Sequence, residues 1–337
     1  MTHRESTVVW LNAPGEIELR TEPLRAPGDK EVLCETLVSA ISPGTELAAY
    51  KGLPPLRPGV VYPRLLGYCN VARVIEVGAA VCGLQPGDRV LTFTSHRSAF
   101  VIAEDDILYK LPETARTEDI ACTYLFHLGY NAVLRGNVRV GSRVLVIGLG
   151  VLGLTTVAMA ALAGARVFAL SDQSGPASIA LQMGAEAVFD RGDLSLLTDR
   201  IGSDLADLVV STTNTWSDWQ VALQAAGQLG VVAVLGFPGR GEPQPPSNPL
   251  DSQYFYMKQL RIEAVGMSPE RPDSRGFCRF NERANIDYLA TQITRGRLNP
   301  SLLVSNCYAG TNVHQAYMDL LARRSSPTTY LLQWNTI

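Results

Sequence analysis

Three glycines with the spacing Gly-x-Gly-x-x-Gly stand near the middle of the chain. They follow the apolar run Val144–Ile147, which predicts a buried strand, and precede Leu154–Ala163, which predicts a helix. In such a unit the first glycine permits a tight turn, the second admits a pyrophosphate, and the third lets the helix pack closely on the strand. The free N–H groups at the helix start then favour phosphate. We therefore expect a dinucleotide to contact Gly148, Gly150, Val151, Leu152 and Gly153.

The residues after the next predicted strand, Arg166–Leu170, bear on the choice between NAD and NADP. In this kind of unit, an acid about twenty residues after the glycine turn binds the adenosine ribose hydroxyls. Asp172 stands near that distance and favours NAD, because a carboxylate repels the 2′-phosphate of NADP. A different alignment puts Ser171 in that position, where a phosphate is tolerated, although no Lys or Arg follows within residues 173–181. The residues favour NAD slightly and leave NADP open.

The composition limits the other classes of partner. With 46% hydrophobic and 18% charged residues, the 337-residue chain can form buried cores, and its net charge of −3 argues against nucleic-acid binding. The six cysteines include no C-x-x-C pair, which argues against a zinc ribbon or a dithiol redox motif. The N-terminus lacks a signal-peptide layout, and glycines interrupt the most apolar stretch. We expect a cytoplasmic protein with a small-molecule substrate and no membrane partner.

The predicted elements change character along the chain. In the first 110 residues, short runs rich in Val, Ile, Leu and Thr alternate with Pro-Gly turns, which favours a compact, barrel-like antiparallel module. These runs are Thr7–Leu11, Glu16–Arg20, Glu31–Ala40, Ala72–Val77 and Arg89–Thr94. Residues 117–135 are expected to form one helix with Thr117 as its cap.

From Arg143 to about Gly266, strand and helix patterns alternate, which predicts an α/β unit with a parallel, doubly wound sheet. Its predicted strands are Val144–Ile147, Arg166–Leu170, Ala187–Phe189, Leu208–Ser211, Val231–Leu235 and Arg261–Val265. Two further helices and a final strand are expected at Asn281–Arg295, Val313–Arg323 and Thr328–Gln333.

Several segments, in this order, resemble those of the medium-chain dehydrogenase/reductase superfamily, which includes zinc alcohol dehydrogenases and quinone reductases. Besides the glycine turn, they are Ser42–Gly52, Pro63–Cys69, Gln85–Val90 and Lys258–Gly266. The resemblance implies a GroES-like, β-rich catalytic domain in residues 1–120 and 270–337, a Rossmann domain in residues 121–269, an active site between them, and a homodimer. It also implies that the cofactor lies beside Thr212, Thr213, Asn214, Gly236 and Phe237.

The positions that bind catalytic zinc in many members of this superfamily hold other residues here. The resemblance aligns Pro43 with the first ligand, Tyr68 with the histidine ligand, and Tyr124 with the third. Zinc needs three protein donors of nitrogen, thiolate or carboxylate type, and only Cys69 remains nearby as one. The four-cysteine lobe of the structural zinc is missing as well. We expect no metal at either site.

Without a Lewis acid, a side chain must stabilise the charge that develops on the substrate oxygen and transfer a proton. Tyr68 is the first candidate and Thr45, which aligns with a hydroxyl that relays protons in the superfamily, is the second. His127 and His96 could relay a proton near neutral pH. The alternatives are that Tyr68 only fills the metal cavity, that Thr45 makes a structural bond, that His127 is packed, and that His96 is solvent-exposed. Glu46 is expected to be a structural acid bonded to backbone, and Cys69 to be buried filler.

Three functions stay open. The Ser-Pro-Gly-Thr-Glu segment and the missing zinc ligands resemble the group that includes bacteriochlorophyllide dehydrogenase, which favours a zinc-independent, NAD(P)-dependent interconversion of a secondary alcohol and a ketone, in secondary metabolism. The second possibility is NADPH-dependent reduction of an enone, enoyl group or quinone. The third is a non-catalytic NAD(P)-binding regulatory protein.

Overall fold

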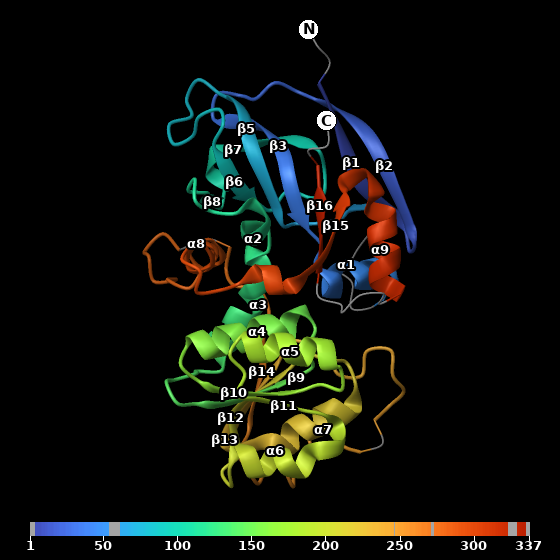
Figure 1. Ribbon diagram of the computed structural model, residues 1–337, viewed down its shortest axis with the longest axis vertical. Coiled ribbons are helices and arrows are strands. Elements are labelled where there is room, and N and C mark those ends of the chain that lie inside the picture. Colours follow the sequence, from blue (N-terminus) through green and yellow to red (C-terminus); the bar gives the residue numbers. More distant parts are fainter. Residues whose placement is uncertain (1–3, 54–60, 246, 271–272, 323–328, 335–337) are drawn as a thin grey trace. The chain divides into compact units, whose positions relative to one another are not determined.

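A computed structural model describes residues 4–53, 61–245, 247–270, 273–322 and 329–334. The chain divides into two compact units (Figure 1). The first comprises residues 1–124 and 283–337, and the second residues 125–282. The predicted domain boundaries, after residues 120 and 269, both lie earlier in the chain than the boundaries of these units, which follow residues 124 and 282.

The second unit is built on a six-stranded sheet in the order β11-β10-β9-β12-β13-β14, with every neighbouring pair parallel. Its strands are β9 (Arg143–Ile147), β10 (Arg166–Leu170), β11 (Ala187–Phe189), β12 (Ala206–Ser211), β13 (Ala226–Val234) and β14 (Arg261–Ala264). Strand β9 is apolar throughout its length after Arg143 because helices cover both faces of a parallel sheet. The predicted doubly wound fold is confirmed.

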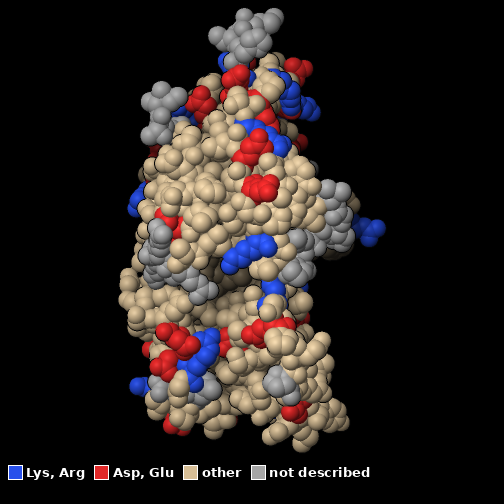
Figure 2. Space-filling view, turned by 90° about the vertical axis from the view of Figure 1, so that its right-hand side faces the viewer, with Lys and Arg blue, Asp and Glu red and all other residues tan. Residues whose placement is uncertain are grey.

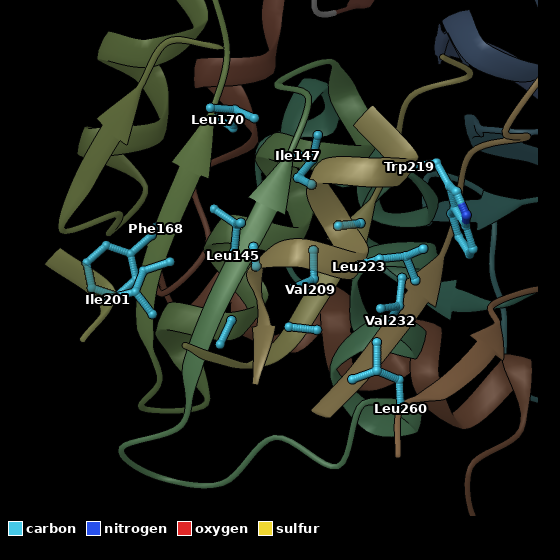
Figure 3. Close-up of a cluster of buried hydrophobic side chains, with 14 residues drawn as sticks. Leu145, Ile147, Phe168, Leu170, Ile201, Val209, Trp219, Leu223, Val232 and Leu260 are labelled. Carbon is cyan, nitrogen blue, oxygen red and sulfur yellow. The ribbon is translucent and has the colours of Figure 1, made fainter. Parts of the chain in front are cut away.

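Helices cover the two faces of this sheet (Figure 1). They are α3 (His127–Arg135), α4 (Val151–Leu162), α5 (Ser174–Gln182), α6 (Leu194–Ile201) and α7 (Trp216–Ala225). Helix α4 packs on β9 and β10, and its buried Thr155 and Thr156 hydroxyls bond back to Val151 and Leu152 carbonyls at 2.9 and 2.6 Å. Figure 3 shows the core under α7, where Leu145, Phe168, Trp219 and Val232 pack together.

The first unit contains a three-stranded and a seven-stranded sheet. The strands of the small sheet are β2 (Glu16–Leu24), β1 (Arg4–Ala13) and β4 (Arg64–Leu65). The strands of the large sheet are β15 (Val304–Ala309), β16 (Thr329–Gln333), β3 (Glu31–Ala40), β5 (Asn70–Val77), β6 (Arg89–Thr92) and β8 (Tyr109–Lys110), with β7 (Ala99–Ala103) paired to β3. Only the β15–β16 pair among the described pairs of this unit is parallel. The expected β-rich domain is thereby confirmed.

Besides the helices that cover the parallel sheet, the described residues form the α-helices α1 (Pro43–Tyr50), α2 (Thr117–Ala121), α8 (Glu282–Thr294) and α9 (Val313–Ala322). Helices α1 and α9 contribute Ala49, Tyr50, Ala316 and Tyr317 to one core of the first unit. The last residue predicted for the helix that became α9, Arg323, and the first predicted for the final strand, Thr328, lie outside the described residues.

One predicted helix is wrong in its extent. Residues 117–135 form α2, a short 3-10 segment η2 (Thr123–Phe126) and α3, rather than one continuous helix. Thr117 is not the cap, because the helix begins at Thr117 itself and Arg116 holds the cap position without a side-chain bond. The Thr117 hydroxyl instead accepts a hydrogen bond from Arg89 at 3.0 Å, which ties α2 to β6.

On the face shown in Figure 2, acidic and basic side chains lie next to one another in small groups, and neither sign forms a continuous patch. Among the described helices, none has the length and apolar character needed to cross a membrane.

Candidate active site

The glycine turn lies between β9 and α4, as predicted. Gly148 has a φ of +88°, and a Cβ there would lie 2.5 Å from the Thr213 methyl carbon. A Cβ on Gly153 would lie 1.9 Å from the carbonyl oxygen of Gly148, so only glycine allows α4 to begin this close to the strand. Gly150 caps the helix, and a Cβ there would meet no atom within 4 Å. The start of α4 thus has close backbone packing behind it and open space at Gly150, which fits a pyrophosphate.

The loops after β10 and β12 begin at the same level as this turn. Leu170 and Ser211 both pair in register with Ile147, whose end position is visible in Figure 3 beside Leu170. The Thr212 hydroxyl donates to the carbonyl oxygen of Ile147 at 2.8 Å. Because the carboxyl ends of parallel strands meet at one edge, the sheet brings the predicted residues of all three loops together.

The loop after β13 joins the same edge. Asn214 accepts a hydrogen bond from the backbone N–H of Phe237 at 2.9 Å, and a Cβ on Gly236 would lie 2.2 Å from the Thr213 carbonyl oxygen. Phe237 is 46% exposed, and the Arg240 guanidinium lies over one face of its ring at 3.9 Å from the centroid. Thr212, Thr213, Asn214, Gly236 and Phe237 therefore form one continuous wall at the carboxyl edge of the sheet.

Asp172 is held by an arginine that the sequence-based prediction missed. Arg191 begins the 3-10 turn η3 (Arg191–Asp193) after β11; its backbone N–H donates to Asp172 at 2.9 Å and its guanidinium also bonds that carboxylate. The same guanidinium donates to both oxygens of Asp218 on α7, at 2.8 and 2.7 Å. The backbone bond from Arg191 is the main reason why the pKa of Asp172 lies below its ordinary value. Examining the residues that follow every predicted strand would have found Arg191, because all of these positions share one edge.

In the first unit, two of the three aligned zinc-ligand positions, Tyr68 and Tyr124, contain aromatic rings. The Tyr68 and Tyr124 rings meet edge to face with centroids 5.3 Å apart, and Phe93 packs on Tyr124 in the same way at 4.9 Å. Cys69 is 1% exposed, and burial raises the pKa of its thiol well above the ordinary value, which agrees with its expected role as buried filler. In the part of the chain that the structure describes, no three His, Cys, Asp or Glu side chains lie close enough to hold a metal ion.

Tyr68 and Thr45, two of the three predicted catalytic residues, are neighbours. Burial is the main cause that raises the pKa of Tyr68 well above that of a free tyrosine, and the neighbouring Ser42 and Thr45 side chains partly offset this rise. Thr45 lies on the first turns of α1 and is exposed. At neutral pH the phenol is therefore protonated and can donate, with an exposed hydroxyl beside it.

Behind these residues lies a buried polar network around Glu46. Its carboxylate accepts the backbone N–H of Ser42 at 2.6 Å and the hydroxyl of Tyr317, and lies 3.0 Å from His96 Nε2. The other ring nitrogen of His96 lies 2.8 Å from the Ser39 hydroxyl. The expected backbone bond of Glu46 is confirmed.

The expected solvent exposure of His96 is wrong, because its side chain is 0% exposed. The ring packs directly over Gly67, where a Cβ would lie 2.6 Å from three ring atoms. Gly67 has a φ of +85°, so the turn before Tyr68 depends on glycine both for its backbone and for room.

His127, the third predicted catalytic residue, belongs to the second unit and is fully buried. Its Nε2 lies 3.2 Å from the Ser268 hydroxyl, and Nδ1 lies 4.0 Å from Glu282. Burial lowers the pKa of His127 to about 4, so the imidazole is neutral at pH 7 and does not titrate near neutral pH as expected. This environment is that of a packed histidine, and a catalytic role for His127 stays a prediction.

Known proteins resemble this chain in both sequence and fold. A family described as a zinc-binding dehydrogenase matches residues 151–280. An uncharacterized zinc-type alcohol dehydrogenase-like protein of Haemophilus influenzae is 22% identical over 356 residues, with 96% of each chain covered. The 2-desacetyl-2-hydroxyethyl bacteriochlorophyllide A dehydrogenase of Cereibacter sphaeroides is 39% identical over 85 residues, 25% of this chain and 26% of that one.

A solved structure extends the likeness to the whole fold. A protein from Sinorhizobium meliloti, described as a zinc-binding dehydrogenase bound to NADP, superposes with a TM-score of 0.80. The two chains are 19% identical, and the superposition covers 98% of this chain and 99% of that one. At this level of identity the likeness shows a shared fold.

Proposed function

Because this chain belongs to the superfamily of zinc-type alcohol dehydrogenase-like, medium-chain oxidoreductases, we propose that it interconverts a secondary alcohol and a ketone with a nicotinamide cofactor and no catalytic metal. The observation that carries this proposal is the Tyr68 phenol, which is protonated at neutral pH and lies beside the Ser42 and Thr45 side chains at the position that aligns with a metal ligand. The likeness to a dehydrogenase of a hydroxyethyl group supports the alcohol as substrate.

The second unit has the features needed to hold the cofactor. Its pyrophosphate would lie against Gly148, Gly150 and Gly153 at the start of α4, with Val151 and Leu152 supplying backbone N–H groups. The adenosine ribose would bind near Ser171 and Asp172, and the wall from Thr212 to Phe237 would flank the rest of the dinucleotide. When bound, the nicotinamide supplies or accepts the hydride.

Ketone reduction places negative charge on the substrate oxygen as the hydride reaches the carbonyl carbon. The Tyr68 hydroxyl donates a hydrogen bond to this oxygen, which stabilises the charge, and then gives it the proton. Thr45 lies beside the phenol and is exposed, so it returns a proton from solvent to the tyrosine. In alcohol oxidation the proton moves in the opposite direction, from the substrate hydroxyl to Tyr68 and then through Thr45 to solvent.

The donor set supports chemistry without zinc. Pro43 has no donor atom, the phenols of Tyr68 and Tyr124 are not among the usual zinc ligands, and the Cys69 thiol is held protonated by burial. These residues do not fit a catalytic zinc ion, and no step here passes through one. Metal analysis of the purified protein that finds stoichiometric zinc would contradict this part of the proposal.

A protonated phenol also serves a reductase of activated C=C bonds, in which the hydride goes to the β-carbon and the proton to the α-carbon. An enone incubated with reduced cofactor separates the two reactions. An allylic alcohol as product supports the proposed function, whereas a saturated ketone replaces it with the alternative. Binding of the cofactor without turnover of ketone, enone or quinone would instead favour the non-catalytic, regulatory alternative.

The deciding experiment is the substitution Tyr68→Phe, which keeps the ring and removes the hydroxyl. Loss of one positioned proton donor predicts a decrease in kcat of about 10²–10⁴-fold with cofactor affinity unchanged. Tyr308→Phe is the matched control, because its hydroxyl bonds Asp319 at 2.7 Å in the same unit and is not part of the site. Unchanged turnover in Tyr68→Phe would remove Tyr68 as the donor.

We also propose that the enzyme is a homodimer, which the family resemblance implies. From the composition we propose that it works in the cytoplasm on a small-molecule substrate, without a nucleic-acid partner. Light scattering coupled to size exclusion tests the dimer directly. A monomeric mass at micromolar concentration would contradict it.

A further inference from the structure

Arg191 joins two carboxylates that come from different elements. It makes two bonds to Asp218, which is 1% exposed, and bonds Asp172, which is 52% exposed, from both its guanidinium and its backbone N–H. Arg191 itself is 36% exposed. The buried side of this bridge is therefore an anchor, and the exposed side faces solvent.

We propose that Arg191 is a specificity-determining residue for the cofactor: anchored by Asp218, it holds Asp172 as a ribose acceptor and makes the site select NAD over NADP. This rests on the proposed function, because it assumes that the edge of the sheet binds a nicotinamide dinucleotide.

The register of the sheet puts the bridge where the adenosine ribose would lie. Asp172 is two residues beyond Leu170, which pairs with Ile147 directly before the glycine turn. The N–H of Gly148 donates to the Leu170 carbonyl at 2.9 Å, so the two loops leave the sheet side by side. A dinucleotide whose pyrophosphate lies at this turn extends its adenosine toward the end of β10.

The charges of the bridge oppose a second phosphate. One guanidinium between two carboxylates leaves the group with a net charge of −1, and hydrogen bonds keep both carboxylates ionised. A 2′-phosphate beside Asp172 would meet an uncompensated negative charge. Arg191 is not available to bind that phosphate, because turning toward it would leave the buried Asp218 carboxylate unpaired.

The bridge also contains what an NADP site would need. If the Asp172 charge is removed, Arg191 still has Asp218 as its anchor, and the guanidinium nitrogen that bonded Asp172 becomes free. An anchored guanidinium at this edge is a strong ligand for phosphate. The substitution Asp172→Asn should therefore raise the affinity for NADPH only while Arg191 is present.

The experiment measures dissociation constants of NADH and NADPH from the enhancement of nicotinamide fluorescence, without a substrate. The wild type should bind NADPH at least about tenfold more weakly than NADH. Asp172→Asn should shift the ratio of the two constants toward NADPH by about tenfold to a hundredfold, and the double variant with Arg191→Gln should lose this shift. Glu186→Gln is the control, because it also removes one exposed carboxylate charge. Glu186 pairs with Arg166 at 2.9 Å at the other end of β10, so this substitution should change neither constant.

The outcomes separate this inference from the proposed function. If the wild type binds neither cofactor, the proposed function fails. If it binds both but prefers NADPH, or if the double variant keeps the shift of Asp172→Asn, the role of Arg191 is refuted while the proposed function stands. An equal shift in Glu186→Gln, which removes the same charge, would also refute it, since the effect would then follow overall charge. Asp172 is exposed, so Asp172→Asn should fold even if Arg191→Gln does not. In that case Arg191→Lys replaces Arg191→Gln in the double variant. Lysine keeps the positive charge but cannot bond both oxygens of Asp218, so this double variant should retain only part of the shift.

Discussion

Replacing Glu46 by alanine tests the buried polar network behind Tyr68. The carboxylate is bonded to the Ser42 N–H and the Tyr317 hydroxyl and lies next to His96. Glu46 is 2% exposed, and His96 and Tyr317 are fully buried, so water cannot easily replace the lost acceptor. Breaking a buried charged network of this kind costs about 3–5 kcal/mol of unfolding free energy. For a unit of this size, such a loss lowers Tm by on the order of 10 °C.

Urea-induced unfolding followed by circular dichroism measures this loss directly. The matched control is Glu35→Ala, because Glu35 is 47% exposed and its ion pair with Arg73 at 3.3 Å should contribute less than about 1 kcal/mol. Glu46→Gln keeps the shape and one acceptor and should lose less than Glu46→Ala. A loss below about 1 kcal/mol in Glu46→Ala would show that the network does not stabilise the fold, and the reasoning would be wrong.

Three further changes probe other parts of the molecule. Gly153→Ala puts a Cβ 1.9 Å from the Gly148 carbonyl oxygen. It should weaken dinucleotide binding, measured by fluorescence, by at least about tenfold. Unchanged affinity would mean that the turn does not hold the pyrophosphate. In the folded state the pKa of His127 is lowered from 6.5 to about 4, so the unfolded state binds a proton first as the pH falls. The free energy of unfolding should therefore decrease by about 3 kcal/mol between pH 6.5 and pH 4 because of this residue. His127→Gln should remove this part of the pH dependence in denaturation curves, and an identical pH profile would contradict it. Phe168→Ala, in the core of Figure 3, should cost about 3–5 kcal/mol in urea unfolding; a much smaller cost would mean that the core repacks.

The parallel sheet and the glycine turn could be predicted because their signals are local. Strands buried on both faces are continuous apolar runs, and the predicted bounds of β10 and β11 match the structure. The turn follows from three glycines whose spacing meets three steric demands within six residues. The cofactor edge then follows from topology, since every strand of the sheet points the same way.

The remaining features depend on contacts between distant residues, which a local pattern does not reveal. Solvent exposure was the expected alternative to a proton relay for His96, but its side chain is buried and bonded by Glu46 and Ser39, about fifty residues away. The role of Thr117 depends on Arg89, which lies 28 residues earlier in the chain, on β6. Arg191 could have been found from its position after β11, but its bond to Asp218 on α7 could not.

Helix α7 has a consequence for how this protein can be observed. Trp216 and Trp219 lie in its first turns beside Asp218, and their indole N–H groups donate to the carbonyls of Pro243 and Pro249 at 3.0 and 2.7 Å. Two of the four tryptophans of the chain thus lie next to the carboxylate that anchors the cofactor edge. The protein carries an intrinsic optical reporter there, and its ultraviolet emission should register the occupancy of the edge without any label.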